Sequence, residues 1–118
     1  MRDPEAAARP SFGVAPGASG TQPVALLYGP GHLIVHGNPP FLAEFGESAV
    51  GLPASEVLIS LPGIAFDVIQ RVYVRGTPLA CWIEVSGERR RLTAAPRRDP
   101  ETKDVYGVAI RISGEPSS

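Results

Sequence analysis

The stretch 64–74 constrains the fold more than any other part of this sequence. Its apolar residues Ile64, Val68 and Val72 recur every four positions, which places them toward one face of a helix. A proline–glycine pair precedes the stretch and a glycine follows it, so chain breakers mark both ends. The segments on either side are rich in strand-forming residues. We therefore expect one longer helix that packs on a sheet built from both ends of the chain.

Two short apolar runs open the ordered part of the chain, at 24–28 and 33–36. A Gly-Pro-Gly turn lies between them. Apolar runs joined by such a turn predict a β-hairpin, here with a loop of about four residues.

A short helix is predicted at 39–45, directly after the hairpin. Asn38 is a favoured N-cap residue, and a proline at the first helical position costs no hydrogen bond. Phe41 and Phe45 lie four residues apart, so they share the buried face of this helix. Gly46 supplies the C-terminal stop.

The rest of the chain divides into one more short helix, at 54–60, and three strands. Strand-forming residues fill three segments: 77–85, 88–95 and 105–113. The second of these is expected to stop at Pro96. The order β-β-α-α-α-β-β-β predicts an α+β fold, with a five-stranded antiparallel sheet and helices on one face.

One domain accounts for most of the chain. Residues 1–22 are rich in Ala, Gly, Pro and Ser and are expected to form a flexible leader, 23–113 the folded domain and 114–118 a polar tail. Neither a secretory signal nor an apolar run of about 20 residues is visible, so no membrane contact is predicted. The single cysteine, Cys81, allows no internal disulfide and indicates a cytoplasmic setting. A formal net charge of −1 does not favour a nucleic-acid partner.

Taken in this order, several residues resemble the PAS family of sensory domains, over roughly residues 23–113. The resemblance rests on an Asn-to-Gly spacing after the first hairpin, a glycine at the next break, a proline near the end of the fourth strand and a glycine in the last strand: Asn38, Gly46, Gly51, Pro96 and Gly107. The sequence departs from the family at Arg111, where an aspartate often stands at the junction with the output helix. Signal transfer through that contact would therefore differ.

The resemblance implies a regulatory domain and not an enzyme. Such a domain binds a small ligand or a partner protein and relays the signal by a shift between conformations. The alternative is a ligand-free module with a filled core, which serves for dimerisation or protein interaction. In either case the expected partners are a second copy of the chain or a signalling domain.

The candidate ligand pocket lies between the helices and the sheet. Strand alternation directs half of the 77–85 strand to this space, either Leu79-Cys81-Ile83 or Ala80-Trp82-Glu84. Both alternatives stay open at this point. The candidates are Phe41, Phe45, Ile64, Val68, Ile69 and Val72 from the helices, with Cys81 and Trp82 from the strand.

Polar chemistry finds little support in the sequence. A small enzyme in which Cys81 is the nucleophile and His36 its base is the least favoured hypothesis. His32 and His36 are too few for a metal site, and the long helix carries no histidine for haem. The cysteine-bearing helix motif of the photosensory LOV domains is absent. The cofactor thus stays unknown, with a non-covalently bound flavin or a small metabolite left open.

Two surface features are candidates for contacts with a partner. The small residues Gly107 and Ala109 permit close approach of another surface, which would suit a dimer. Arg89 and Arg91 should point to one side of their strand and Arg90 to the other, and a solvated sheet surface is the commoner explanation for such a run.

Overall fold

The computed structural model of this 118-residue chain describes residues 22–85 and 87–113. Strands open and close the described part, and the helices lie between them. In chain order the elements are β1 (Val24–Tyr28), β2 (Leu33–Gly37), α1 (Pro39–Phe45), η2 (Glu47–Ala49), α2 (Ala54–Val57), α3 (Gly63–Arg75), β3 (Leu79–Val85), β4 (Glu88–Arg98) and β5 (Val105–Ser113).

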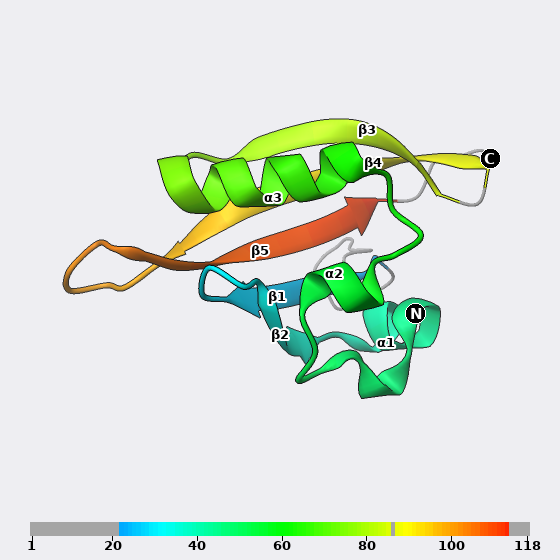
Figure 1. Cartoon of the computed structure of the whole chain (residues 1–118), viewed down its shortest axis with the longest axis horizontal. Coiled ribbons are helices and arrows are strands. Elements are labelled where there is room, and N and C mark those ends of the chain that lie inside the picture. The colour runs from blue at the N-terminus through cyan, green and yellow to red at the C-terminus, as the bar shows by residue number, and fades with distance from the viewer. Residues whose placement is uncertain (1–21, 86, 114–118) are drawn as a thin grey trace, which may run out of the picture.

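The five strands form one antiparallel sheet in the order β2-β1-β5-β4-β3. The first hairpin joins the last three strands through the pairing of β1 with β5, so the two ends of the domain meet at the centre of the sheet. Figure 1 shows α3 along β3, β4 and β5, with α2 in front of β1. The predicted α+β fold class and element order are confirmed.

Asn38 connects the first strand to the first helix. Its Oδ1 accepts hydrogen bonds from the backbone N–H of Phe41 at 3.0 Å and of Val24 at 2.9 Å. Its Nδ2 donates to the carbonyl oxygen of Gln22 at 2.8 Å. The predicted N-cap is confirmed, and the same side chain also holds the start of β1 in place.

Two glycines follow helical segments at positions where the backbone has a positive φ. Gly46, after α1, has a φ of 109°, and its N–H donates to the carbonyl of Leu42. Gly51, at the next break, has a φ of 100°. These values favour glycine, which explains both positions of the PAS-like pattern.

The prediction that β4 stops at Pro96 is wrong, because β4 continues to Arg98. Pro96 pairs with Val108 of β5, whereas the pairing of β3 with β4 begins only at Leu79 and Ala94. No residue of β3 therefore pairs with Pro96. Because proline lacks an N–H, a position without a strand partner on that side loses no hydrogen bond. A proline is tolerated at such a partly unpaired position.

The short helices differ modestly from the prediction. The helix expected at 54–60 ends at Val57, after which Leu61 N–H donates to the carbonyl of Leu58 in a tight turn. The 3₁₀-helix η2 was not predicted, since three residues without a side-chain cap carry no clear sequence signal.

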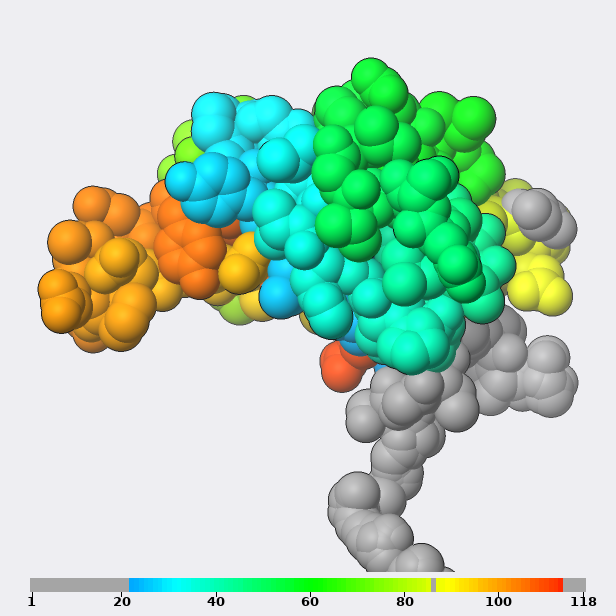
Figure 2. Space-filling view, turned by 90° about the horizontal axis from the view of Figure 1, so that it is seen from below, coloured from blue at the N-terminus to red at the C-terminus, as the bar shows by residue number. Residues whose placement is uncertain are grey.

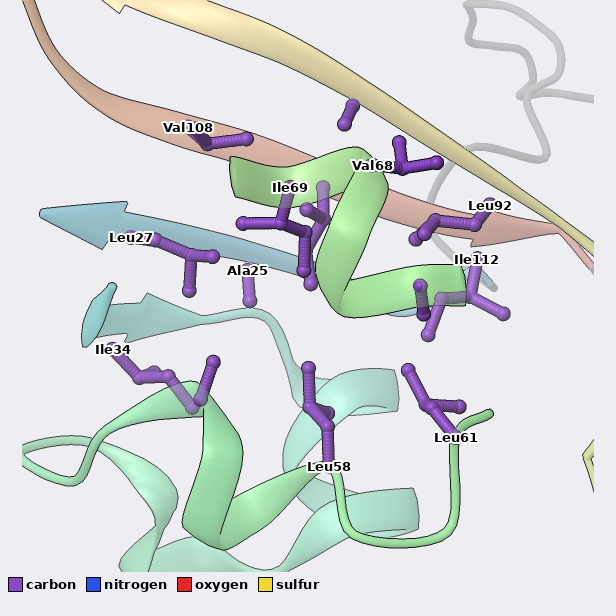
Figure 3. Close-up of a cluster of buried hydrophobic side chains, with 14 of the residues drawn as sticks. Ala25, Leu27, Ile34, Leu58, Leu61, Val68, Ile69, Leu92, Val108 and Ile112 are labelled. Atoms are coloured by element: carbon purple, nitrogen blue, oxygen red, sulfur yellow. The ribbon is translucent and has the colours of Figure 1, made fainter. Parts of the chain in front are cut away.

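The core lies between the sheet and the helices. In Figure 3, Ile69 of α3 and Leu58 after α2 point into the space in front of β1 and β5. Burial of each such side chain contributes about 1.5–3 kcal/mol, so this layer dominates the stability. The largest fully buried side chains are Phe41, Leu27, Ile34, Leu58, Ile69, Leu92, Ile110, Ile112, Val72 and Val108.

Candidate functional site

The interior space contains most of the predicted pocket residues. Phe41, Val68, Ile69 and Val72 are buried between helices and sheet. Phe45 is partly buried and packs against Phe41, with ring centroids 4.8 Å apart. These side chains contact the hydrophobic core, and their role in binding a ligand stays a prediction.

The expectation that Ile64 faces the sheet is wrong, since 51% of this residue is exposed. A helix repeats every 3.6 residues, so a spacing of four drifts by about 40° at each step. The stripe that packs on the sheet is therefore Ala65, Val68, Ile69 and Val72. Figure 3 shows Val68 and Ile69 on the core side of α3.

The alternation of β3 decides between the two faces that the sequence left open. Cys81 is half-buried and packs against the core, on the same side as the buried Ile83. Trp82 lies on the opposite, outer face of the sheet and is 47% exposed, so its place among the pocket candidates was wrong. Burial raises the pKa of the Cys81 thiol, and the nearby Arg91 lowers it to a lesser extent.

Cys81 and His36 do not meet. Cys81 lies on β3 and His36 on β2, which are the two opposite edges of the sheet. His32 instead contacts α3, where its Nε2 lies 2.8 Å from Oε1 of Gln70 and its ring meets Tyr73 edge-on. Within residues 22–85 and 87–113, no group of three His, Cys, Asp or Glu side chains is placed to hold a metal ion.

The outer face of the sheet carries a shallow hollow of about 300 Å³. Cross-strand pairing explains it, because Ala109 of β5 lies between Leu26 of β1 and Ala95 of β4. Small side chains at neighbouring positions leave a depression where larger ones would fill the surface. The lining residues are Val24, Thr93, Ala95, Ala109, Ile110 and Arg111. Sequence reasoning missed this hollow.

Trp82 lies beside this hollow in a basic setting. The guanidinium carbons of Arg89 and Arg91 lie 4.4 and 5.4 Å from the centre of its ring. Such cation–π contacts contribute about 0.5–1 kcal/mol each at exposed sites. Arg90 points to the other face and forms an ion pair with Glu44 of α1, as strand alternation predicted.

The other end of the outer face is aromatic. The rings of Tyr28 and Tyr106 lie 6.2 Å apart, and the Arg97 guanidinium carbon is 4.8 Å from the Tyr106 ring centre. Arg97 Nη1 also donates to the carbonyl oxygen of Leu27 at 3.0 Å. Arg97 therefore fastens β4 to β1 across β5.

Gly107 has a different role from the one expected. A Cβ atom at this position would overlap the carbonyl oxygen of Leu27 and lie 3.2 Å from the Tyr28 Cα. The close approach that Gly107 permits is thus that of β1 in the same chain. The interpretation of this glycine as a dimer contact is not supported, whereas Ala109 does line the outer hollow.

A second, more polar hollow of about 410 Å³ lies at the C-terminal end of α3. One of the cations that line it is Arg98, whose Nη2 donates to the Gly76 carbonyl and whose Nη1 donates to the Lys103 carbonyl. The guanidinium thus holds the β4–β5 hairpin against the end of α3. Figure 2 shows this hairpin, in orange, projecting beyond the rest of the domain.

None of the helices in the described ranges is long and apolar enough to cross a bilayer. No protein-family model matches the chain, and no curated protein sequence matches it either.

Solved structures do match the chain. The PAS domain of the histidine kinase ThkA aligns with a TM-score of 0.63 at 20% identity, over 78% of this chain and 98% of that domain. A sensory box histidine kinase from Vibrio cholerae aligns with a TM-score of 0.66 at 13% identity, over 80% and 82%. The light state of the blue-light photoreceptor Aureochrome1 LOV aligns with a TM-score of 0.61 at 14% identity, over 82% and 84%. The chain therefore has the fold of PAS and LOV domains, as the sequence resemblance implied.

Proposed function

We propose that this chain is a regulatory PAS-fold module that binds a partner protein through the outer face of its sheet. The observation that carries the proposal is the hollow at Thr93, Ala95 and Ala109, which lies between exposed aromatic residues. Exposed apolar surface rimmed by polar groups is typical of protein interaction sites. The neighbours of the same fold include the PAS domain of a histidine kinase and a sensory box sensor histidine kinase.

The contrast between the two faces of the sheet supports this choice. On the helix side, Leu92 and Val108 are fully covered by the core. On the outer side, Trp82 and Tyr28 are about half exposed, although residues of this type gain most from burial. Aromatic and arginine side chains are also the residues that dominate binding energy at protein interfaces. A partner on the outer face would cover both the aromatic and the arginine side chains.

The test is a selection for binding peptides on the immobilised full chain, followed by a comparison of two variants. Ala109→Arg fills the hollow, and Val74→Arg places the same side chain on the exposed side of α3 as a matched control. We expect selected peptides to lose binding to Ala109→Arg and to retain it for Val74→Arg. Light scattering on the same proteins reports whether a second copy uses this face.

Thr93→Arg serves as a second variant should Ala109→Arg lower the melting temperature. Peptides that bind the wild type and both hollow variants equally well would overturn the proposal. So would a set of peptides whose binding depends only on Val74.

The second candidate function is ligand sensing between α3 and the sheet, in a cytoplasmic setting. It is favoured by the cluster of buried apolar side chains in that space and by the partly buried side chains at its margin, Phe66, Tyr73 and Cys81. An absorbance spectrum of the purified chain and a thermal-shift screen with flavins and small metabolites test it. A ligand that raises the melting temperature of the wild type, but not of Val68→Trp, would support this function. A screen without a single such ligand would count against it.

A further inference from the structure

We propose that the polar hollow at the C-terminal end of α3 binds a small organic molecule through its phosphate group. The hollow lies where α3 meets the hairpin between β4 and β5, and Figure 1 shows both at the same end of the domain. It shares no lining residue with the hollow on the outer face. A ligand there goes beyond the proposed function and does not depend on it. Three features support the site: its charges, the way in which Arg98 is held, and its size.

The lining residues bring an excess of positive charge to this hollow. Arg75 comes from the last turn of α3, Arg98 from the end of β4 and Lys103 from the hairpin. Asp104 is the one acidic residue in the lining. Within the part of the chain that the structure describes, Asp104 forms no ion pair with any of these cations. Three separate segments of the chain thus direct positive charge to one place.

The helix dipole accounts for only part of this charge. The C-terminal end of a helix carries about half a negative elementary charge, which stabilises a nearby lysine or arginine. Together with Asp104, it leaves about 1.5 positive charges of the three cations without compensation. The Gly76 carbonyl, directly after α3, is already covered by its hydrogen bond with Arg98. An anion in the hollow would therefore meet a net positive potential.

Arg98 is fixed in place by backbone groups and not by a carboxylate. Its Nη2 donates to the Gly76 carbonyl at 2.6 Å and its Nη1 to the Lys103 carbonyl at 2.7 Å. A Cβ atom at position 76 would overlap Arg98 Nη2, so the glycine makes room for the guanidinium over the end of the helix. A guanidinium has five N–H donors, and these two bonds leave three for a ligand. Because the side chain is already ordered, it loses little conformational entropy when an oxyanion binds.

Lys103 adds a cation from a loop whose conformation is held by its own hydrogen bonds. Asp99 Oδ1 accepts from the N–H groups of Glu101 and Thr102 at 2.8 and 3.1 Å. Lys103 Nζ donates to the Pro100 carbonyl at 3.0 Å and keeps two further N–H donors. The φ of Lys103 is 69°, a left-handed value that glycine adopts more readily. Replacement by glycine therefore removes the cation without straining the turn.

The charge and size of the hollow favour a phosphate that carries an organic group. A phosphate monoester has a charge of about −1.5 to −2 at neutral pH and three acceptor oxygens, which matches the uncompensated charge and the donors of several side chains. A carboxylate brings one charge and two oxygens. The volume of about 410 Å³ lies in the range of about 300–1,000 Å³ that is typical of small-molecule sites. Tyr73, Val74 and Val105 add apolar surface, against which the organic group would pack.

The test compares three probes on the full chain: phenyl phosphate, inorganic phosphate and benzoate. Lys103 is the single lysine of the chain, so its acylation by an amine-specific reagent, measured by peptide mass spectrometry, reports occupancy of the hollow. We expect phenyl phosphate to protect Lys103 in a saturable manner and to bind at least about threefold more tightly than either other probe. The NMR shift of the Gly76 amide gives an independent readout.

Variants of the full chain localise the effect. Arg75 and Arg71 are both exposed on α3, but only Arg75 lines the hollow, so they form a matched pair. Arg75→Gln should weaken phenyl phosphate at least about threefold, and Arg71→Gln by less than about 1.5-fold. Lys103→Gly should weaken it about threefold, measured at the Gly76 amide, without lowering the melting temperature.

Four outcomes would overturn the inference. Equal losses in Arg75→Gln and Arg71→Gln would show a general attraction of anions and no site. Benzoate that binds as tightly as phenyl phosphate would refute the preference for phosphate. Inorganic phosphate that binds as tightly would assign the hollow to a free ion, and a phosphoserine peptide that binds more tightly would assign it to a phosphorylated protein. None of these results affects peptides that bind the outer face, so the proposed function is tested separately.

Discussion

Replacement of Asn38 by alanine should destabilise this domain more than a surface substitution of the same size. The side chain makes three hydrogen bonds, which join the start of β1 to the start of α1. Loss of an N-cap costs about 1 kcal/mol. The N–H of Val24 would lose its acceptor as well, which costs about 1–2 kcal/mol for a partly buried group. We therefore expect Asn38→Ala to lower the free energy of unfolding by about 2–3 kcal/mol.

Asn38→Asp is the informative control. The carboxylate keeps an acceptor for both Phe41 N–H and Val24 N–H, but its second oxygen replaces the donor to the Gln22 carbonyl with an unfavourable contact between two acceptors. A negative charge at a helix N-terminus is also favourable, so the cost should stay below about 1 kcal/mol.

Urea denaturation measures both variants. With an m-value of about 1–1.5 kcal/mol per molar urea, Asn38→Ala should lower the midpoint by roughly 1.3–3 M. Hydrogen exchange at the Val24 amide gives an independent readout and should accelerate in Asn38→Ala only. A loss below about 1 kcal/mol in Asn38→Ala, or equal losses in both variants, would refute the assigned role of the side chain.

Three other substitutions or reactions test the packing. Gly107→Ala should destabilise by about 2 kcal/mol or more because its Cβ meets the backbone of β1, whereas Gly63→Ala, with open space around it, should not destabilise at all; urea denaturation compares them. Ile69→Ala should cost about 2–4 kcal/mol and Ile64→Ala less than about 1 kcal/mol in the same assay, and equal costs would contradict the assigned face of α3. Because its pKa is raised, the Cys81 thiol forms less thiolate at neutral pH and should be alkylated more slowly than a free thiol. The alkylation rate should still increase above pH 9.0, and a rate that becomes constant below about pH 8 would contradict this expectation.

The elements with local signals were predicted from the sequence almost to the residue. Asn38 and the two prolines after it lie at the start of α1 and Gly46 lies directly after its end, so the bounds of this helix follow from neighbouring residues. β1 and β5 also have their predicted bounds. In these segments, apolar patterning and turn residues agree with the tertiary structure, and no distant contact is needed to locate them.

Three of the errors concern features that depend on distant parts of the chain. Whether β4 tolerates Pro96 depends on where β3 begins, which the sequence around Pro96 does not encode. The face of Trp82 depends on which side of β3 the helices cover, and Cys81 and Trp82 are both compatible with a core. The role of Gly107 depends on β1, about 80 residues earlier in the chain. The register between distant strands, and not the secondary-structure propensity of the residues, therefore limits what can be predicted from this sequence.

The arginine run 89–91 shows how this register also determines the interpretation of charge. Counted along the chain, the three residues form one basic cluster, and a net charge of −1 suggests that acidic residues offset it. In the fold, Arg90 is separated from its neighbours and pairs with Glu44, which ties β4 to α1. Arg89 and Arg91 lie with Trp82 on the outer face, where Arg111 joins them from β5. A balanced total charge is thus compatible with a basic outer face, because the charge of one face depends on the residues that lie on it and not on the sum over the chain.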